Sequence, residues 1–244
     1  MKARALLEER LAFAAPSRRL RLALADRVLS DRLGSRPARL VDAGCGDGLL
    51  ALALAKRHPE WKILGLDLRE NLLEGARRRA AGRGLDNVEF VAADLTDRFP
   101  VTDLDVVLGI ECLEEIEDDE GAMHRMSEAL APGGTLVLHV PERNWRPVLP
   151  GSDPTWRDQV RQGYTARDLE EMITRAGLEI ERIEPTYRFT AVLAQEARDR
   201  IKGSGLAVRT LAFPALAGAV RLERLGITGG AARAFLAVAR RPPA

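Results

Sequence analysis

The sequence predicts an α/β protein built on a parallel β-sheet with helices on both faces. Two observations predict this class. Short apolar runs alternate with helical periods between residues 39 and 140, and the first apolar run leads through a glycine-rich turn into a helix. The chain has 244 residues, of which 46% are hydrophobic. This length and composition suit one large α/β domain with an elaboration better than two independent cores.

The sheet is expected to form through five successive strand and helix steps. The expected strands are short apolar runs, and the helices between them show a period near 3.6 residues. The strands are expected at residues 39–43, 62–66, 88–92, 105–109 and 135–140, and the helices at 48–57, 72–81 and 119–130. The residues Ala131-Pro132-Gly133-Gly134 predict a turn that ends the last of these helices.

Residues 1–36 predict an N-terminal helical layer of one or two helices rich in Ala, Leu and Arg. Pro16 and Ser17 interrupt the helical pattern. Ser17 is suited to cap a second helix over residues 18–33, which Gly34 would end. The main core is then expected over residues 37–189.

The second half of the chain departs from the regular alternation. Residues 141–163 are expected to be irregular, and loops of this length are often lids or binding loops. Thr165 is expected to cap a helix over 166–176, and a strand is expected at 178–184.

A helical and unusually apolar insert, residues 190–230, stands where a hairpin turn would suffice. The last strand, 234–239, is expected within the final segment 231–244. The insert is therefore the elaboration of the domain.

Charge is balanced overall but unevenly distributed. The chain has 37 basic and 36 acidic side chains, so its net charge of +1 gives no global field for gripping nucleic acid or anionic lipid. Residues 1–39 and 196–244 each carry an excess of six positive charges, and the middle carries an excess of eleven negative charges. Two interpretations stay open: solvated helix faces, or attraction of both ends to a substrate or surface that bears phosphate.

The two cysteines, Cys45 and Cys112, lie in different contexts that form neither a disulfide framework nor a metal cluster. Neither a signal-peptide pattern nor an apolar run long enough to cross a bilayer is found in the sequence. We therefore expect a cytoplasmic protein.

The glycine-rich turn, Val41-Asp42-Ala43-Gly44-Cys45-Gly46-Asp47-Gly48, has the spacing G-x-G-x-G. Glycines allow a positive φ and remove Cβ atoms where a ligand must touch the backbone. The spacing differs from the G-x-G-x-x-G pattern that places a pyrophosphate at a helix N-terminus. Asp42 and Asp47 would repel a pyrophosphate and would suit a ligand with an ammonium or sulfonium group.

Two more carboxylates follow the second and third expected strands. Asp67 lies 21 residues after Gly46, where it could accept hydrogen bonds from both hydroxyls of a ribose, and Asp94 could accept from the amine of an adenine. Each acid alone is as well explained by a helix cap or a solvated turn. Because ligands of open parallel sheets bind beyond the carboxyl ends of the strands, Asp42, Asp67 and Asp94 together predict one site.

The order of these motifs resembles the class I S-adenosylmethionine (SAM)-dependent methyltransferases, in the small-molecule branch that includes quinone-biosynthesis methyltransferases. The similarity covers roughly residues 38–185. It rests on VDAGCGDG, GLDL at 65–68, AADL at 92–95, LDVVLGIECLEEI at 104–116 and LAPGGTLVLHVPE at 130–142. The resemblance implies a Rossmann-like sheet of seven strands in the order 3-2-1-4-5-7-6, with only the last strand antiparallel.

The resemblance also implies roles for individual residues toward SAM. Gly44 and Gly46 would pass under its methionine part, and Asp42 would help to hold its amino group. Asp67 would bind the ribose, and Asp94 with Leu95 would bind the adenine. Cys45 and Leu68 are also expected among the cofactor-binding residues. Glu111 would lie close to both the cofactor and the acceptor.

Methyl transfer to a hydroxyl is helped by a base, and three candidates are Glu111, His139 and Tyr164. His139 is also explained as a packing residue at a strand end. Glu115 stands where this branch often has a histidine, which removes a familiar base candidate.

O-methylation is favoured. C-methylation, and a protein that binds SAM without transferring its methyl group, stay as alternatives. The glycine spacing disfavours a nicotinamide-dependent oxidoreductase.

Metal and nucleic acid are not expected in this chemistry. The acidic run over residues 114–120 is expected to lie beside a helix start in a solvated setting rather than to bind a metal. The residues Gly109-Ile110-Glu111-Cys112 lack both the stacking clamp and the Pro-Cys nucleophile that base methylation needs.

The acceptor is expected to be a small and apolar molecule, such as a natural product, a quinone precursor or a lipid-linked sugar. The apolar stretch at 205–222 could cover the acceptor pocket, pack in the core or a dimer, or lie on a membrane surface with its basic flanks. We expect a monomer or a homodimer.

Overall fold

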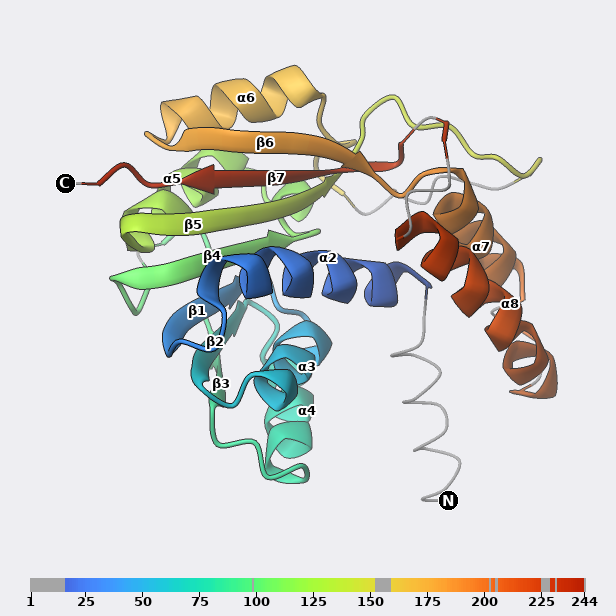
Figure 1. The fold of residues 1–244 in the computed structure, drawn as a ribbon, viewed down its shortest axis with the longest axis horizontal. Coiled ribbons are helices and arrows are strands. Elements are labelled where there is room, and N and C mark those ends of the chain that lie inside the picture. Colours follow the sequence, from blue (N-terminus) through green and yellow to red (C-terminus); the bar gives the residue numbers. More distant parts are fainter. Residues whose placement is uncertain are drawn as a thin grey trace.

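Seven strands form a single sheet at the centre of the computed structural model, in the order β3-β2-β1-β4-β5-β7-β6 (Figure 1). The structure describes residues 16–97, 99–151, 159–201, 203–204, 206–224, 229–230 and 232–243. β3, β2, β1, β4 and β5 run parallel, and β7 is antiparallel to both β5 and β6. The Rossmann-like seven-stranded fold and its strand order are thus confirmed.

The elements follow closely the alternation seen in the sequence. In chain order they are α2 (Pro16–Leu33), β1 (Ala38–Ala43), α3 (Leu49–Arg57), β2 (Trp61–Asp67), α4 (Glu70–Ala81), β3 (Val88–Ala92), β4 (Leu104–Ile110), η1 (Leu113–Glu115), α5 (Asp119–Ala129), β5 (Leu130–Pro141), α6 (Ala166–Arg175), β6 (Glu179–Thr186), α7 (Phe189–Arg200), α8 (Leu206–Arg224) and β7 (Ala234–Arg240).

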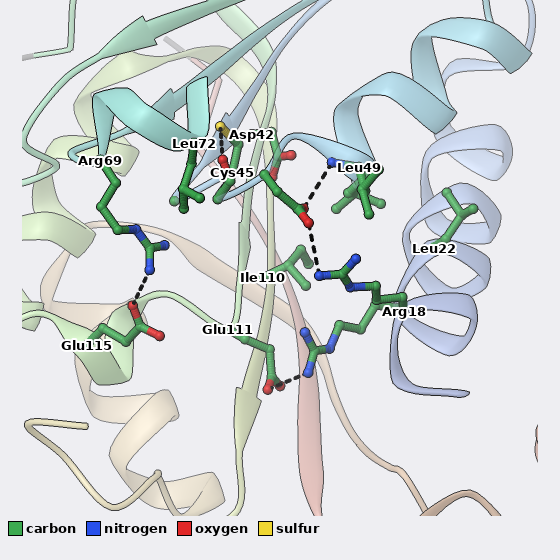
Figure 2. Close-up of a pocket in the computed structure, with 15 residues that line it drawn as sticks. Arg18, Leu22, Asp42, Cys45, Leu49, Arg69, Leu72, Ile110, Glu111 and Glu115 are labelled. Atoms are coloured by element: carbon green, nitrogen blue, oxygen red, sulfur yellow. Dashed lines mark hydrogen bonds and ion pairs between the residues drawn. The ribbon is translucent and has the colours of Figure 1, made fainter. Parts of the chain in front are cut away.

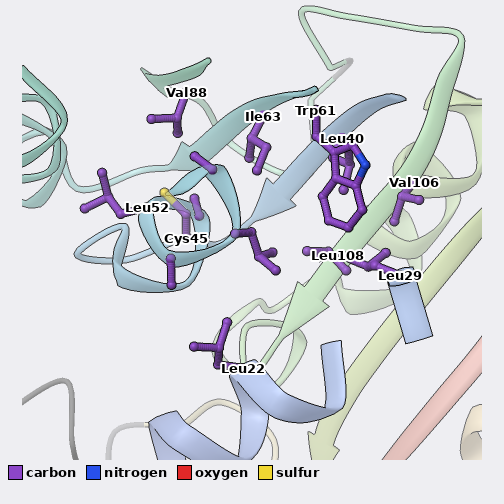
Figure 3. Close-up of a cluster of buried hydrophobic side chains, with 14 of the residues drawn as sticks. Leu22, Leu29, Leu40, Cys45, Leu52, Trp61, Ile63, Val88, Val106 and Leu108 are labelled. Atoms are coloured by element: carbon purple, nitrogen blue, oxygen red, sulfur yellow. The ribbon is translucent and has the colours of Figure 1, made fainter. Parts of the chain in front are cut away.

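Two layers of helices cover the sheet. α2, α3 and α4 pack on one face, in a cluster that includes Leu29, Leu52, Trp61 and Leu108 (Figure 3). α5 and α6 cover the other face. β1 and β4 are apolar along almost their whole length because they lie in the middle of the sheet and are buried on both faces.

The strand order places a topological switch point between β1 and β4. β1 pairs with β2 on one side and with β4 on the other, so the chain leaves these two strands toward opposite helical layers. The carboxyl ends of the two strands therefore leave a crevice, the usual ligand site of open α/β sheets.

Two expectations for the ends of elements are wrong. Residues 131–134 do not form a separate turn. β5 begins at Leu130 and runs through them, because Gly133 N–H donates to the carbonyl of Arg241 and Arg241 N–H donates to the carbonyl of Gly134. Ser17 does not cap α2, because the helix already begins at Pro16. Proline is well suited to a first helical turn, which needs no N–H donor from it.

The described residues of the insert before the last strand are mainly helical, as expected, and form α7 and α8. Both helices contact α2, so the insert and the N-terminal layer meet at one end of the sheet (Figure 1). The helix expected before Pro16 lies outside the described residues. Within the described part of the chain, no helix is both long and apolar enough to span a bilayer.

The start of α6 offers a direct test of this local structure. Thr165 Oγ1 accepts from Asp168 N–H and the Asp168 side chain accepts from Thr165 N–H, which is a complete capping box. Replacing Thr165 by Ala should lower the free energy of unfolding by about 1 kcal/mol in denaturant titrations, since a helix cap is lost. Thr165→Ser retains the hydroxyl and should stay within about 0.5 kcal/mol of the wild type. Equal losses for both variants would contradict the capping role.

Candidate functional site

A cavity of about 450 Å³ opens in the crevice between β1 and β4, beneath α2 (Figure 2). This volume lies within the range of roughly 300–1,000 Å³ that is typical of small-molecule sites. Its lining combines the end of β1 and the glycine-rich turn, the starts of α3 and α4, the N-terminal helix α2, and the end of β4 with the segment that follows it. The lining residues are Arg18, Arg21, Leu22, Asp42, Gly44, Cys45, Gly46, Asp47, Leu49, Leu50, Arg69, Leu72, Ile110, Glu111 and Glu115.

The glycines of the turn are required by both conformation and space. Gly44 and Gly46 have φ values of 70° and 56°, in the left-handed region that side chains disfavour. A Cβ on Gly44 would lie 2.3 Å from the Cβ of Cys112. At Gly46 the nearest neighbour of such an atom is Nη2 of Arg69, 3.8 Å away. The turn therefore exposes backbone to the cavity at Gly46.

Asp42 lies near the end of β1 and is almost fully buried, with 2% of its surface exposed. Its Oδ2 has no hydrogen-bond partner among the described residues. Burial raises the pKa of Asp42 to about 7, although the backbone N–H of Ala51 partly offsets this. A buried acceptor without a donor, on the wall of a cavity, indicates a ligand that brings a donor or a positive charge.

Asp67, at the end of β2, has both carboxylate oxygens engaged by the chain itself. Gly46 N–H donates to Oδ2 at 2.7 Å, and Arg69 donates to Oδ1 through its backbone N–H and its Nε, at 3.0 and 2.9 Å. Burial raises the pKa of Asp67, but the hydrogen bonds from Arg69 and Gly46 outweigh it, so the pKa lies below its usual value. Asp67 thus fixes the glycine-rich turn, and Arg69 would have to give way before a ribose could reach this carboxylate.

Glu111 directly follows β4 and has a left-handed backbone, with φ of 55°. Oε2 accepts from Nη2 of Arg21 at 2.9 Å, and Oε1 lies 2.8 Å from Nδ1 of His139. Burial raises the pKa of Glu111, but the opposing effect of Arg21 and His139 is larger and brings the pKa down to about 2. Glu111 is therefore a fixed carboxylate and a weak base.

The structure separates the three expected bases. Glu111 lines the cavity. His139 lies behind it, 1% exposed, between Glu111 and Oγ1 of Thr186. Tyr164 is fully buried and donates its hydroxyl to Asp119, outside the cavity lining.

The expected cofactor residues also divide into two groups. Asp42, Gly44, Cys45, Gly46 and Glu111 line the cavity, and Asp67 is bonded to that lining. Three others are not among the lining residues. The Leu68 side chain is 70% exposed, Asp94 is exposed and accepts from Thr96, and Leu95 packs in the core.

The acidic run after β4 is less solvated than expected. Glu114 is fully buried, and Asp119 is 8% exposed because Arg161 and Tyr164 both donate to it. Burial raises the pKa of Glu114 well above its usual value. Among the residues the structure describes, no group of three His, Cys, Asp or Glu side chains has a metal-binding arrangement.

Sequence reasoning missed the three arginines of the cavity. Arg18 pairs with Asp47 at 3.0 Å, Arg21 pairs with Glu111, and Arg69 pairs with Asp67. Figure 2 shows Arg69 directed at Glu115, a second carboxylate that it approaches across the cavity. The excess positive charge of residues 1–39 was the available indication for the first two. It did not specify which of the arginines of that segment face the sheet.

Comparison with known proteins identifies methyltransferases as relatives of this chain. A methyltransferase domain family matches residues 40–134. Trans-aconitate 2-methyltransferase of Acidovorax sp. (strain JS42) is 33% identical over 136 residues, which are 54% of this chain and 51% of the relative. The chain thus spans about half the length of that relative. Trans-aconitate 2-methyltransferase of Methylobacterium nodulans is 36% identical over 182 residues, 70% of this chain and 69% of the relative.

A solved structure similar to the whole fold is that of the cyclase SpnF. It superposes with a TM-score of 0.67 at 26% identity and covers 91% of this chain and 82% of its own.

The buried carboxyl of Asp42 gives a pH prediction for the ligand-free protein. Its pKa is about 7 in the folded chain and about 4 in an unfolded one. Because the folded state holds this proton more tightly, stability falls as the pH rises from about 4 to about 7, by up to roughly 1.4 kcal/mol per unit. The Asp42→Asn variant should not show this loss of stability, because an amide does not titrate.

Urea titrations at about pH 5 and about pH 7.5 measure the difference in unfolding free energy between Asp42→Asn and the wild type. The unfolding free energy of Asp42→Asn, measured relative to the wild type, should increase by roughly 1–3 kcal/mol as the pH rises. A difference that does not change with pH would show that Asp42 does not titrate as a buried acid.

Proposed function

Because this chain belongs to the class I SAM-dependent methyltransferases, we propose that it transfers the methyl group of SAM to an oxygen atom of a small-molecule acceptor. The observation that carries the proposal is the buried Oδ2 of Asp42 on the wall of the cavity, to which none of the described residues donates a hydrogen bond. The ammonium group of SAM supplies the missing donor and charge. A pyrophosphate cofactor would add negative charge beside Asp42 and Asp47.

The remaining cavity residues suit the other parts of the cofactor. Gly44 and Gly46 offer backbone without side chains, next to Asp42. Asp67 would hold the ribose hydroxyls once the Arg69 side chain has moved aside. Asp94 and Leu95 stay predictions for the adenine end, and Leu68 stays a predicted cofactor contact.

When bound, SAM supplies an electrophilic methyl group on a sulfonium. The chain's own part is to hold the partners in line and to exclude water, which together are worth on the order of 7–11 kcal/mol in such reactions. Glu111 orients the side chains of Arg21 and His139 by accepting hydrogen bonds from them. Its paired state makes it a poor proton acceptor, so neither it nor the buried His139 and Tyr164 are assigned as bases that touch the acceptor.

The small-molecule acceptor is supported by the size of the cavity and by the relatives, which are named for trans-aconitate. C-methylation of a similar acceptor is the nearest alternative. An apolar acceptor, contact of the 205–222 stretch with a membrane surface, and a monomeric or homodimeric state stay predictions.

A protein that binds SAM without transferring its methyl group is a second candidate. The likeness to SpnF favours keeping it, because that protein is named as a cyclase. The two candidates differ in a single measurement, the appearance of S-adenosylhomocysteine (SAH) during turnover.

Transfer is tested with SAM labelled in its methyl group and trans-aconitate, followed by a small-molecule extract of the source cells. The proposal predicts enzyme-dependent label in a small molecule, with one SAH formed per methyl group. SAM binding without SAH formation in any fraction would favour the non-transferring candidate. Absence of SAM binding would overturn both candidates.

The role of Asp67 can be measured separately by titration calorimetry with SAH. Asp67→Ala should weaken SAH binding by roughly 10- to 100-fold, from the charge-assisted hydrogen bonds that are lost. Asp97→Ala, an exposed acid after β3 that is not among the cavity residues, is the matched control and should change the affinity less than about twofold. Equal affinities for the Asp67 variant and the wild type would contradict the ribose assignment.

A further inference from the structure

The carboxylate of Asp67, at the end of β2, already accepts as many hydrogen bonds as it can hold. Oδ2 accepts from Gly46 N–H at 2.7 Å and from Nη2 of Arg69 at 3.2 Å. Oδ1 accepts from the backbone N–H and from Nε of Arg69, at 3.0 and 2.9 Å. A carboxylate has about four acceptor positions. A further donor, such as a ribose hydroxyl, can therefore bind Asp67 only by replacing one of these four.

The two backbone donors to Asp67 are fixed by the fold, and the two guanidinium donors are not. Gly46 lies in the glycine-rich turn between β1 and α3. The backbone of Arg69 begins α4, where its carbonyl accepts from the N–H of Leu72 at 3.0 Å. The Arg69 side chain, in contrast, is half exposed. A donor that reaches Asp67 from the cavity would therefore displace the guanidinium.

A second carboxylate, that of Glu115, lies within reach of the same guanidinium (Figure 2). Oε2 of Glu115 is 3.9 Å from Nη1 of Arg69. Glu115 is the last residue of η1, lines the cavity and is half exposed, as Arg69 is. Because both side chains are long and half exposed, rotation about their side-chain bonds can shorten this distance without movement of the backbone. The guanidinium thus has a partner available when it leaves Asp67.

Arg69 differs in this respect from the other two arginines of the cavity lining. Among the described residues, Arg18 and Arg21 each have one carboxylate within ion-pair distance, whereas Arg69 has two. Arg18 and Arg21 lie on α2 and hold that helix to the crevice. Arg69 is therefore the lining arginine that can change partners without losing its counter-charge.

We propose that Arg69 and Glu115 form a clasp that retains the cofactor. When the ribose hydroxyls of the cofactor occupy Asp67, the Arg69 guanidinium passes to Glu115, and this ion pair closes its end of the cavity over the ligand. The inference rests on the proposed function and deepens the account of its cofactor site. It gives Glu115, which stands where the resembling branch often has a histidine, a role in holding the cofactor rather than in moving a proton.

The rate of SAH release measures the clasp, by surface plasmon resonance with the full chain immobilised. Glu115→Gln removes the second partner of Arg69 and should speed release roughly 2- to 5-fold in about 50 mM salt, the effect of one half-exposed ion pair. The association rate should change by less than about twofold, because Asp67 keeps all its donors. Raising the salt to about 1 M should speed release from the wild type toward the rate of the variant, since salt screens exposed charges.

Arg69→Gln tests the other member of the pair. This change removes the clasp and also frees Asp67 from two donors, so SAH should both associate and dissociate faster than with the wild type. The double variant, Arg69→Gln with Glu115→Gln, should release SAH no faster than Arg69→Gln alone, because both changes remove the same ion pair. Glu117→Gln is the matched control, since Glu117 is exposed and is not among the lining residues, and it should release SAH at the wild-type rate.

Release from Glu115→Gln at the wild-type rate in low salt would overturn the clasp. Increases in release rate that multiply in the double variant would also overturn it, because Arg69 and Glu115 would then act independently. Either result leaves the proposed cofactor site standing, since SAH still binds. If the wild type does not bind SAH, the proposed function and the clasp are both overturned.

Discussion

The site depends on a difference in hydrogen bonding between two carboxylates at adjacent strand ends. Asp42 in β1 and Glu111 after β4 both line the crevice at the switch point of the sheet. The fold provides Glu111 with an arginine and a histidine, and its pKa falls to about 2. Asp42 has one oxygen that no described residue pairs with, and its pKa rises to about 7. One carboxylate is therefore part of the structure, and the other is available to a ligand.

Pairing of Glu111 also joins distant parts of the chain. Arg21 brings in α2, His139 brings in β5, and Thr186 ties His139 to the end of β6. The N-terminal helix is thereby fixed over the crevice on the same side as α3.

The regular part of the fold could be predicted from the sequence. β3 has the expected bounds, 88–92, and the order of the strands follows from the motifs that resemble a known family. Residues 131–134 were expected to form a turn because Pro and two Gly residues dominate the local pattern. Hydrogen bonding to Arg241, far away in the sequence, overrides that pattern. The local sequence around residues 131–134 contains no signal for this pairing.

The parts of the site whose residues lie close together in the sequence could be predicted, and the parts whose residues lie far apart could not. The glycine-rich turn and Asp42 lie within a few residues of one another, so their spacing alone placed them together. Arg21 and Glu111 are 90 residues apart, and neither the choice of arginine nor the loss of basicity at Glu111 can be read from a pattern. The same holds for Tyr164, whose hydroxyl is taken by Asp119 from another element.

Proton release on cofactor binding tests the central claim, that the unpaired oxygen of Asp42 receives the ammonium of SAM. Calorimetric titrations of SAH at about pH 6.5, in two buffers with different ionisation enthalpies, measure the protons exchanged on binding. The account predicts a net release of protons from the wild type, because the ammonium favours the charged carboxylate, and a much smaller release from Asp42→Asn. Binding without proton release, or with equal release in both proteins, would contradict it.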